Sequence, residues 1–189
     1  MRRLLVTAAL VLASAAPAHA EVKDAAPGGF TVENTVVVPV DATTAWSALV
    51  GEVDAWWPKD HSWWGADSRL SIEPRAGGCF CEISGDRQAQ HMAVTFVEPG
   101  KLLRMTGGLG PLQGMGLHGA LEFRLEPVEG EAAPSTRITM YYRAGGYSPD
   151  DLSAFAPVVD QVQAQQLGGL AEHLRRAPPA PEPPDPSAG

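Results

Sequence analysis

The feature that most constrains this fold is a series of short segments in which apolar and polar residues alternate, followed by one long amphipathic segment. The alternation runs from about residue 68 to residue 143, and turn residues separate its segments. A period of two indicates an antiparallel sheet with one apolar face. Residues 152–174 carry apolar side chains at helical spacing and are long enough to cover that face. We therefore predict an α+β fold, with a curved antiparallel sheet of about six to seven strands around a long C-terminal helix.

Turn residues and changes of period set the boundaries of the other predicted elements. The predicted strands are 31–40, 68–73, 79–83, 91–97, 102–106, 119–125 and 136–143. A first helix is predicted from Ala42 to about Trp57, with Asp41 as its cap. In the C-terminal helix, Pro157 predicts either a kink or a short helix that feeds a longer one. Gly168-Gly169 favours the close approach of another backbone.

The two ends of the chain have the composition of segments outside a folded domain. Residues 1–20 combine Arg2-Arg3, a short apolar run and Ala18-His19-Ala20, the three parts of a secretory signal peptide cleaved after Ala20. Residues 21–29 indicate a short flexible lead-in, and residues 177–189 indicate a Pro-rich disordered tail. We expect a periplasmic or secreted protein without membrane insertion after signal cleavage.

The charge balance and the absence of familiar motifs limit the partners and cofactors. The sequence has 22 Asp plus Glu against 14 Lys plus Arg, a net charge of −8. Nucleic acids and anionic membranes are bound through basic patches, so we expect neither as a partner. The G-x-G-x-x-G pattern of residues 114–119 precedes a predicted strand, whereas a dinucleotide site requires a helix there. We expect no cofactor and no metal.

Three ordered stretches of the sequence carry a family resemblance. They are the strand-then-helix opening at 35–46, the E-P-x-x-G-G-x-F-x-E hairpin within 70–82, and the segment 98–104. With the terminal helix they resemble the START-like (SRPBCC) superfamily, near its polyketide cyclase/dehydratase and Aha1-like groups. The resemblance implies one helix-grip domain over residues 30–176, with a ligand cavity between sheet and terminal helix. It transfers no catalytic residues, because the superfamily shares no catalytic set.

Residues predicted on the inward face of the sheet, or at the open end of the enclosed space, are the candidates for ligand contact. At the mouth we expect Trp63 and Trp64, from a Trp-rich loop, and Met115, from an apolar mobile loop over residues 107–119. The expected wall residues are Cys81, Met92, Met105, Phe123, Met140, Tyr142 and Val159. Alternatively, the aromatic residues of this region serve packing, with Trp46 and Trp56 anchoring the first helix to the sheet, and residues 107–119 are an ordinary hairpin connection.

Strand parity predicts where the polar candidates point. His91 alternates with Met92 and Phe96, which places this histidine on the outer face or the rim of the sheet. The same argument places His118 and Arg104 outside. Tyr142 shares the face of its apolar neighbours and is the hydroxyl that we expect inside.

Cys79 and Cys81 are the two cysteines. In an extended strand, residues two apart are about 6.6 Å apart on one face. A disulfide needs the two Cβ atoms about 4 Å apart, so the extended geometry opposes a bond between these cysteines. We therefore interpret them as buried free thiols on the apolar face. A strained or intermolecular disulfide is one alternative, and a metal site that includes His91 or His118 is another.

The predicted architecture is consistent with three functions. The first is an exported domain that binds a small apolar or aromatic molecule in the cavity. The second is an enzyme of the cyclase/dehydratase kind, in which a cavity Tyr or His acts as general acid or base. That chemistry needs at least two polar side chains facing inward. The third is a protein-interaction module of the Aha1-like kind.

Overall fold

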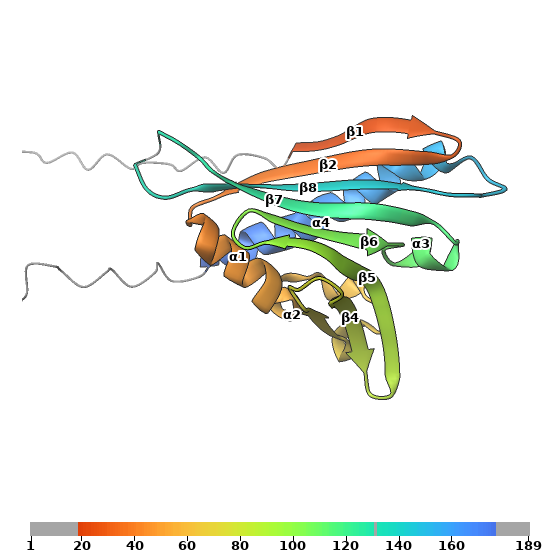
Figure 1. Ribbon diagram of the computed structural model, residues 1–189, viewed down its shortest axis with the longest axis horizontal. Coiled ribbons are helices and arrows are strands. Elements are labelled where there is room, and N and C mark those ends of the chain that lie inside the picture. The colour runs from red at the N-terminus through yellow and green to blue at the C-terminus, as the bar shows by residue number, and fades with distance from the viewer. Residues whose placement is uncertain (1–18, 131, 177–189) are drawn as a thin grey trace, which may run out of the picture.

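A computed structural model of the chain describes residues 19–130 and 132–176 (Figure 1). The predicted tail and residues 1–18 of the predicted signal peptide lie outside these ranges. Eight strands form one antiparallel sheet in the order β1-β2-β8-β7-β6-β5-β4-β3. They are β1 (His19–Ala26), β2 (Gly29–Val38), β3 (Arg69–Ile72), β4 (Cys79–Ser84), β5 (Arg87–Glu98), β6 (Leu102–Gly107), β7 (His118–Pro127) and β8 (Thr136–Gly145).

The helical elements cover one side of this sheet. They are α1 (Ala42–Gly51), α2 (Val53–Trp56), η1 (Lys59–His61), η2 (Gly65–Asp67), α3 (Pro111–Gly114), η3 (Leu152–Phe155) and α4 (Ala156–Arg176). Helix α4 lies behind the strands in Figure 1 and contacts β1 and β2, and both α1 and α2 pack against it. The predicted α+β architecture is confirmed.

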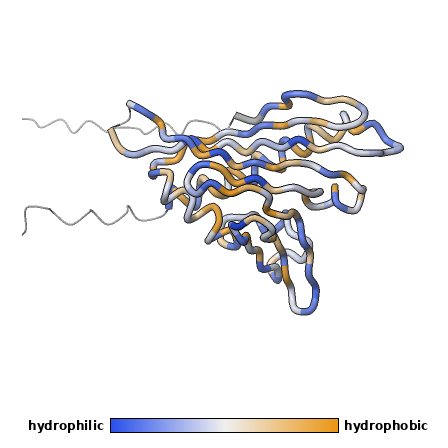
Figure 2. The backbone as a smooth tube through the Cα atoms, viewed as in Figure 1, coloured by the Kyte–Doolittle hydropathy of each residue, from blue (hydrophilic) through white to orange (hydrophobic). Residues whose placement is uncertain are grey.

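The core lies between the inner face of the sheet and α4. Apolar and polar residues alternate along the strands in Figure 2, as a sheet with one buried face requires. Leu121, Ile138 and Met140 are fully buried on the sheet side, and Leu167 and Leu170 are fully buried on the helix side. Within the described ranges, no helix combines the length and the apolar character needed to cross a membrane.

The segment expected to be a flexible lead-in is instead a strand, which is why the sheet has eight strands. β1 pairs with β2 through a register that includes Glu21↔Glu33 and Ala26↔Gly29. All residues from Glu21 to Ala26 are exposed. β1 therefore has no apolar face, and its edge position rests on backbone hydrogen bonds that leave no period-two signal in the sequence.

The first helix is shorter than predicted, because the chain turns between α1 and α2. Asp41 caps α1 as expected, with its carboxylate accepting the Thr44 N–H at 2.8 Å. The indole N–H of Trp56 donates to the carbonyls of Ala48 and Leu49, at 3.1 and 3.3 Å. This side chain thus adds hydrogen bonds at the end of α1, where the Ala48 carbonyl also accepts the Glu52 N–H.

At the C-terminal helix two sequence predictions are confirmed. The short η3 ends at Phe155 and the longer α4 begins at Ala156, next to Pro157. This matches the predicted alternative of a short helix that leads into a longer one. A Cβ added at Gly169 would clash with the backbone carbonyl oxygen of Trp56, whereas one added at Gly168 would meet open space. Gly169 is therefore the position where the two backbones meet.

Cys79 and Cys81 form a disulfide, so their interpretation as free thiols is wrong. Their Cα atoms are 5.4 Å apart, closer than in an extended strand and within the range that a disulfide spans. The pairing of β4 with β5 shifts register between Phe80 and Cys81. The ladder is therefore irregular between the two cysteines, whereas the separation of about 6.6 Å applies to an ideal extended strand.

Candidate functional site

A cavity of about 440 Å³ lies at the end of the core near α3. The N-terminal half of α4, the α3 loop and the segment 57–63 surround it, and β5 and β8 each contribute one residue. Its lining residues are Trp57, Asp60, His61, Ser62, Trp63, His91, Leu109, Gly110, Pro111, Leu112, Met115, Tyr142, Phe155, Val158, Val159, Val162, Gln163 and Gln166.

Exposure distinguishes the mouth of the cavity from its interior. Trp63 and Val158 are 48% and 61% exposed and mark the mouth. Tyr142, Gln163 and His91 are 0%, 1% and 6% exposed and form the interior. The cavity is thus apolar over most of its wall and carries polar groups at depth.

The buried carboxylate of Glu82 holds one side of the cavity in place. Its Oε1 accepts the backbone N–H groups of Trp63 and Trp64, at 2.9 and 3.2 Å, and the Ser68 hydroxyl at 2.5 Å. Its Oε2 lies 2.8 Å from Nε2 of His91. Burial by itself raises the pKa of the Glu82 carboxyl, but the hydrogen bonds from Ser68, Trp63 and His91 outweigh burial and hold the pKa below its ordinary value.

His91 faces inward, which corrects the prediction from strand parity. Phe80 pairs with Met92 and Cys81 pairs with Gln90, so His91 is an extra residue in β5, a β-bulge. The bulge places His91 and Met92 on the same, buried side.

A second bulge lies farther along β5. Val94 pairs with Met105 and Phe96 pairs with Arg104, so Thr95 is the extra residue. Phe96, predicted to share the face of Met92, is therefore 41% exposed.

The geometry assigns the tautomer of His91. Because the Glu82 carboxyl is ionised, Nε2 of His91 carries the hydrogen and donates it. Nδ1 is then the ring nitrogen with a lone pair in the neutral imidazole. A carboxylate that orients a histidine in this way is the arrangement used by general bases.

Tyr142 points inward as predicted. Its hydroxyl oxygen accepts the backbone N–H of Leu109 at 3.3 Å, which ties β8 to the loop that carries α3. Burial raises the pKa of the Tyr142 phenol, and the Leu109 hydrogen bond opposes this in part. The phenol is therefore a neutral group in the cavity wall.

Three polar side chains of the wall were not predicted. Both amide atoms of Gln163, Oε1 of Gln166 and Nδ1 of His61 are buried and have no hydrogen-bond partner among the described residues. The sequence did contain a signal, because glutamines at 163 and 166 interrupt the apolar spacing of the terminal helix on its buried side.

The structure brings together four of the ten predicted ligand-contact residues. Trp63, Met115, Tyr142 and Val159 line the cavity. The residues that belong to the filled core, at 0% or 1% exposure, are Met92, Met105, Phe123 and Met140. Cys81 lies in the disulfide, and Trp64 packs under the Arg87 guanidinium, 5.2 Å from the ring centroid. A role for the four wall residues in binding stays a prediction.

The glycine-rich segment 107–119 forms one wall of the cavity. It contains α3, with Leu109, Leu112 and Leu117 buried, and it leads into β7. A strand therefore follows the G-x-G-x-x-G pattern, as the sequence predicted.

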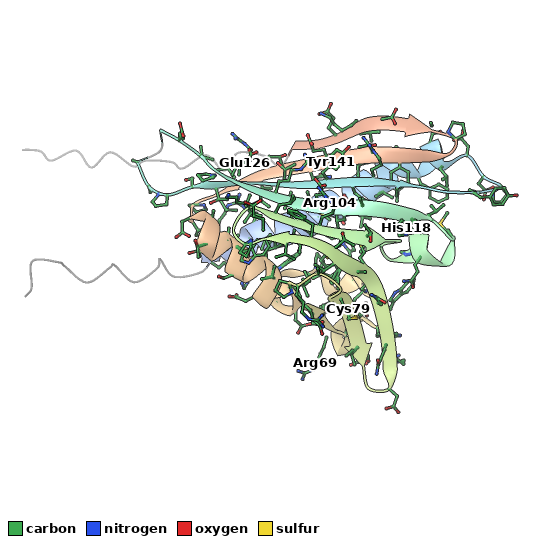
Figure 3. All side chains as sticks on the ribbon, viewed as in Figure 1. Arg69, Cys79, Arg104, His118, Glu126 and Tyr141 are labelled. Atoms are coloured by element: carbon green, nitrogen blue, oxygen red, sulfur yellow. A yellow bond between two sulfur atoms is a disulfide. The ribbon has the colours of Figure 1, made fainter. Side chains whose placement is uncertain are left out.

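The other polar candidates lie on the opposite side of the sheet, the outer face on which Arg104, His118 and Tyr141 are labelled in Figure 3. Arg104 pairs there with Glu122 at 2.6 Å, and His118 is exposed. Both match the prediction. Across residues 19–130 and 132–176, no three His, Cys, Asp or Glu side chains converge as they would around a metal ion.

Comparison with known proteins identifies the fold. The crystal structure of protein MLL2253 from Mesorhizobium loti matches with a TM-score of 0.53 and 20% identity, over 78% of this chain and 98% of that one. CalU16 from Micromonospora echinospora matches with 0.54 and 12%, over 84% and 87%. Ara h 8.0201 matches with 0.54 and 15%, over 78% and 98%. The chain has the helix-grip fold of the SRPBCC proteins.

These likenesses concern the fold and not the ligand. No protein-family model matches the sequence, and no curated protein matches it.

Replacement of Glu82 by Gln tests its part in holding the site. We expect Glu82→Gln to lower the free energy of unfolding at pH 7 by about 1–3 kcal/mol, because buried donors lose an ionised acceptor. Since the folded pKa is depressed, the contribution of Glu82 is present above the unfolded value of about 4.3 and is lost as the pH falls through the folded pKa. The difference in the free energy of unfolding between Glu82→Gln and wild type should therefore become smaller below about pH 4.

Urea unfolding from pH 3 to pH 7 measures this difference. The exposed Glu126→Gln is the matched control and should follow wild type at every pH. An offset for Glu82→Gln that stays constant over the whole range would contradict the role of the ionised carboxylate.

Proposed function

We propose that this protein binds a small, largely apolar molecule in the cavity between α4, the α3 loop and the segment 57–63. The observation that carries the proposal is the cavity itself, about 440 Å³ beside a buried apolar core. This volume is in the range of sites for small ligands. The helix-grip fold allows such a site, because one helix covers a curved sheet incompletely.

The composition of the wall favours a ligand with a flat hydrophobic body. Trp57, Trp63, Phe155 and Tyr142 supply aromatic surface, and valines of α4 supply aliphatic surface. Apolar area removed from water contributes about 25 cal/mol per Å². Aromatic walls add a preference for edge or stacked contacts with another ring.

A cavity-filling substitution tests the proposal. N-phenyl-1-naphthylamine, a neutral probe that fluoresces in apolar surroundings, should bind wild type with enhanced emission. Val159→Trp places an indole in the cavity and should weaken probe binding by about tenfold or more. The control Ile83→Trp adds the same group at a position that is 42% exposed and outside the cavity, and should bind like wild type.

Both variants should keep the wild-type far-UV circular dichroism. If wild type fails to enhance the emission, or if Val159→Trp binds as well as Ile83→Trp, the cavity is not a binding site.

The Glu82–His91 pair favours a second candidate, an enzyme that moves a proton on the bound molecule. Nδ1 of His91 would accept a proton from a carbon next to a ligand carbonyl, while the C–H electron pair moves into the carbonyl to give an enolate. Return of a proton from the imidazole to the enolate completes the cycle without any other reactant. His61, Tyr142 and Gln166 line the same cavity and could contact the oxygen.

Hydrogen–deuterium exchange tests this candidate without knowledge of the natural substrate. With 2-tetralone in D₂O, wild type should accelerate loss of the proton signals next to the carbonyl by about 100-fold or more over buffer. His91→Gln should abolish the acceleration, and the outer-face control His118→Gln should retain it. If wild type binds 2-tetralone but the protons exchange only at the rate measured in buffer, this function is excluded.

We further propose that the protein is exported and that its mature form begins at Glu21. The Cys79–Cys81 disulfide supports this, because disulfides persist in oxidising compartments. Cleavage after Ala20 would leave Glu21–Ala26 paired with β2. The intact mass of protein from the periplasm or medium of a bacterial host should match a chain that starts at Glu21. A chain that keeps residues 1–20 and stays in the cytoplasm would contradict export.

A further inference from the structure

Two glutamines in the middle of α4 form a polar site inside the cavity that protein groups leave unsatisfied. Gln163 is 1% exposed, and neither its Nε2 nor its Oε1 has a partner among the described residues. Gln166 is 3% exposed, and its Oε1 likewise has none. Both side chains line the cavity, and their spacing of three places them on one face of the helix.

This arrangement is unfavourable unless another molecule completes it. Amide groups buried without hydrogen bonds destabilise a protein. The next turns of the same buried face carry Leu167, Leu170 and Leu174, which pack without such a cost. The two glutamines therefore point to a ligand group that offers a hydrogen-bond acceptor and a donor together.

The scarcity of charged groups in the wall disfavours an ionised ligand group at this site. No Lys or Arg is among the described residues that line the cavity, and Asp60 is exposed. His91 already bonds to Glu82, whose carboxylate is occupied by four donors. Apart from His61, the described wall offers no group to act as counterion, so a ligand carboxylate or ammonium at the glutamines would be a costly buried charge.

We propose that the cavity selects neutral molecules in which an aromatic or alicyclic body carries a carboxamide or a lactam. An amide presents its C=O and N–H side by side, which complements the NH₂ and C=O of a glutamine. The apolar body occupies the space between the aromatic wall and the α4 valines. This inference rests on the proposed function, because it assigns the ligand class of that same site.

Three probes of one shape test the inference on wild-type protein. They are naphthalene-2-carboxamide, methyl 2-naphthoate, which lacks the N–H donor, and 2-naphthoate, which is ionised at pH 8. By isothermal titration calorimetry at pH 8, the carboxamide should bind at least about fivefold tighter than the ester. The naphthoate should bind more weakly than the carboxamide.

Substitutions of nearly equal size assign the preference to the two glutamines. Gln163→Met and Gln166→Met should each reduce the advantage of the carboxamide over the ester, with ester binding unchanged or tighter. Gln165→Met is the matched control, since Gln165 is exposed on the same helix, and it should keep the wild-type ratio. Without ligand, Gln163→Met should melt at a higher temperature than wild type, because it removes unpaired buried groups.

The outcomes separate this inference from the proposed function. Equal binding of carboxamide and ester by wild type, or a preference that survives both substitutions, would overturn the amide class and leave ligand binding intact. Failure of all three probes and of N-phenyl-1-naphthylamine would overturn both. The wild-type comparison needs no variant, so poor folding of a variant does not remove the test.

Discussion

The buried carboxylate of Glu82 is the interaction on which the site depends. A fully buried, ionised carboxyl group is tolerated only when donors surround it. Here the donors come from three places, namely the segment that starts at Trp63, the hydroxyl of Ser68 and the bulge of β5 at His91. One charge thereby fixes the mouth of the cavity and one part of its interior. The loop that carries the exposed Trp63 is held by two of its backbone N–H groups, which donate to the Glu82 carboxylate.

The cavity lies at one end of α4 because the helix has two different halves. The C-terminal half presents leucines to the sheet and packs solidly, with Gly169 letting the backbone of Trp56 come close. The N-terminal half presents valines and glutamines to the cavity, and loops close the space around them. The inner face of the central strands is therefore filled core. The C-terminal half of α4 thus contributes to the packed core, and the N-terminal half borders the cavity.

Regular alternation made much of the fold predictable. Strands β3, β6 and β8 bury alternate residues along one face, and the terminal helix shows its buried stripe. β1 could not be found in this way because it buries neither face. Tyr142 follows the alternation of β8 and points inward as predicted, whereas His91 sits at a bulge, where parity inverts without any mark in the composition.

The sequence by itself determined the α+β class, the order of the elements and the presence of a covering helix, because hydrophobic periodicity depends on local geometry. Only the tertiary structure decided the Cys79–Cys81 disulfide, the inward turn of His91 and the meeting of two glutamines with four aromatic rings around one space. These features depend on strand register and on contacts between segments far apart in the chain. A change of register by one residue moves a side chain to the other face, and no local pattern records it.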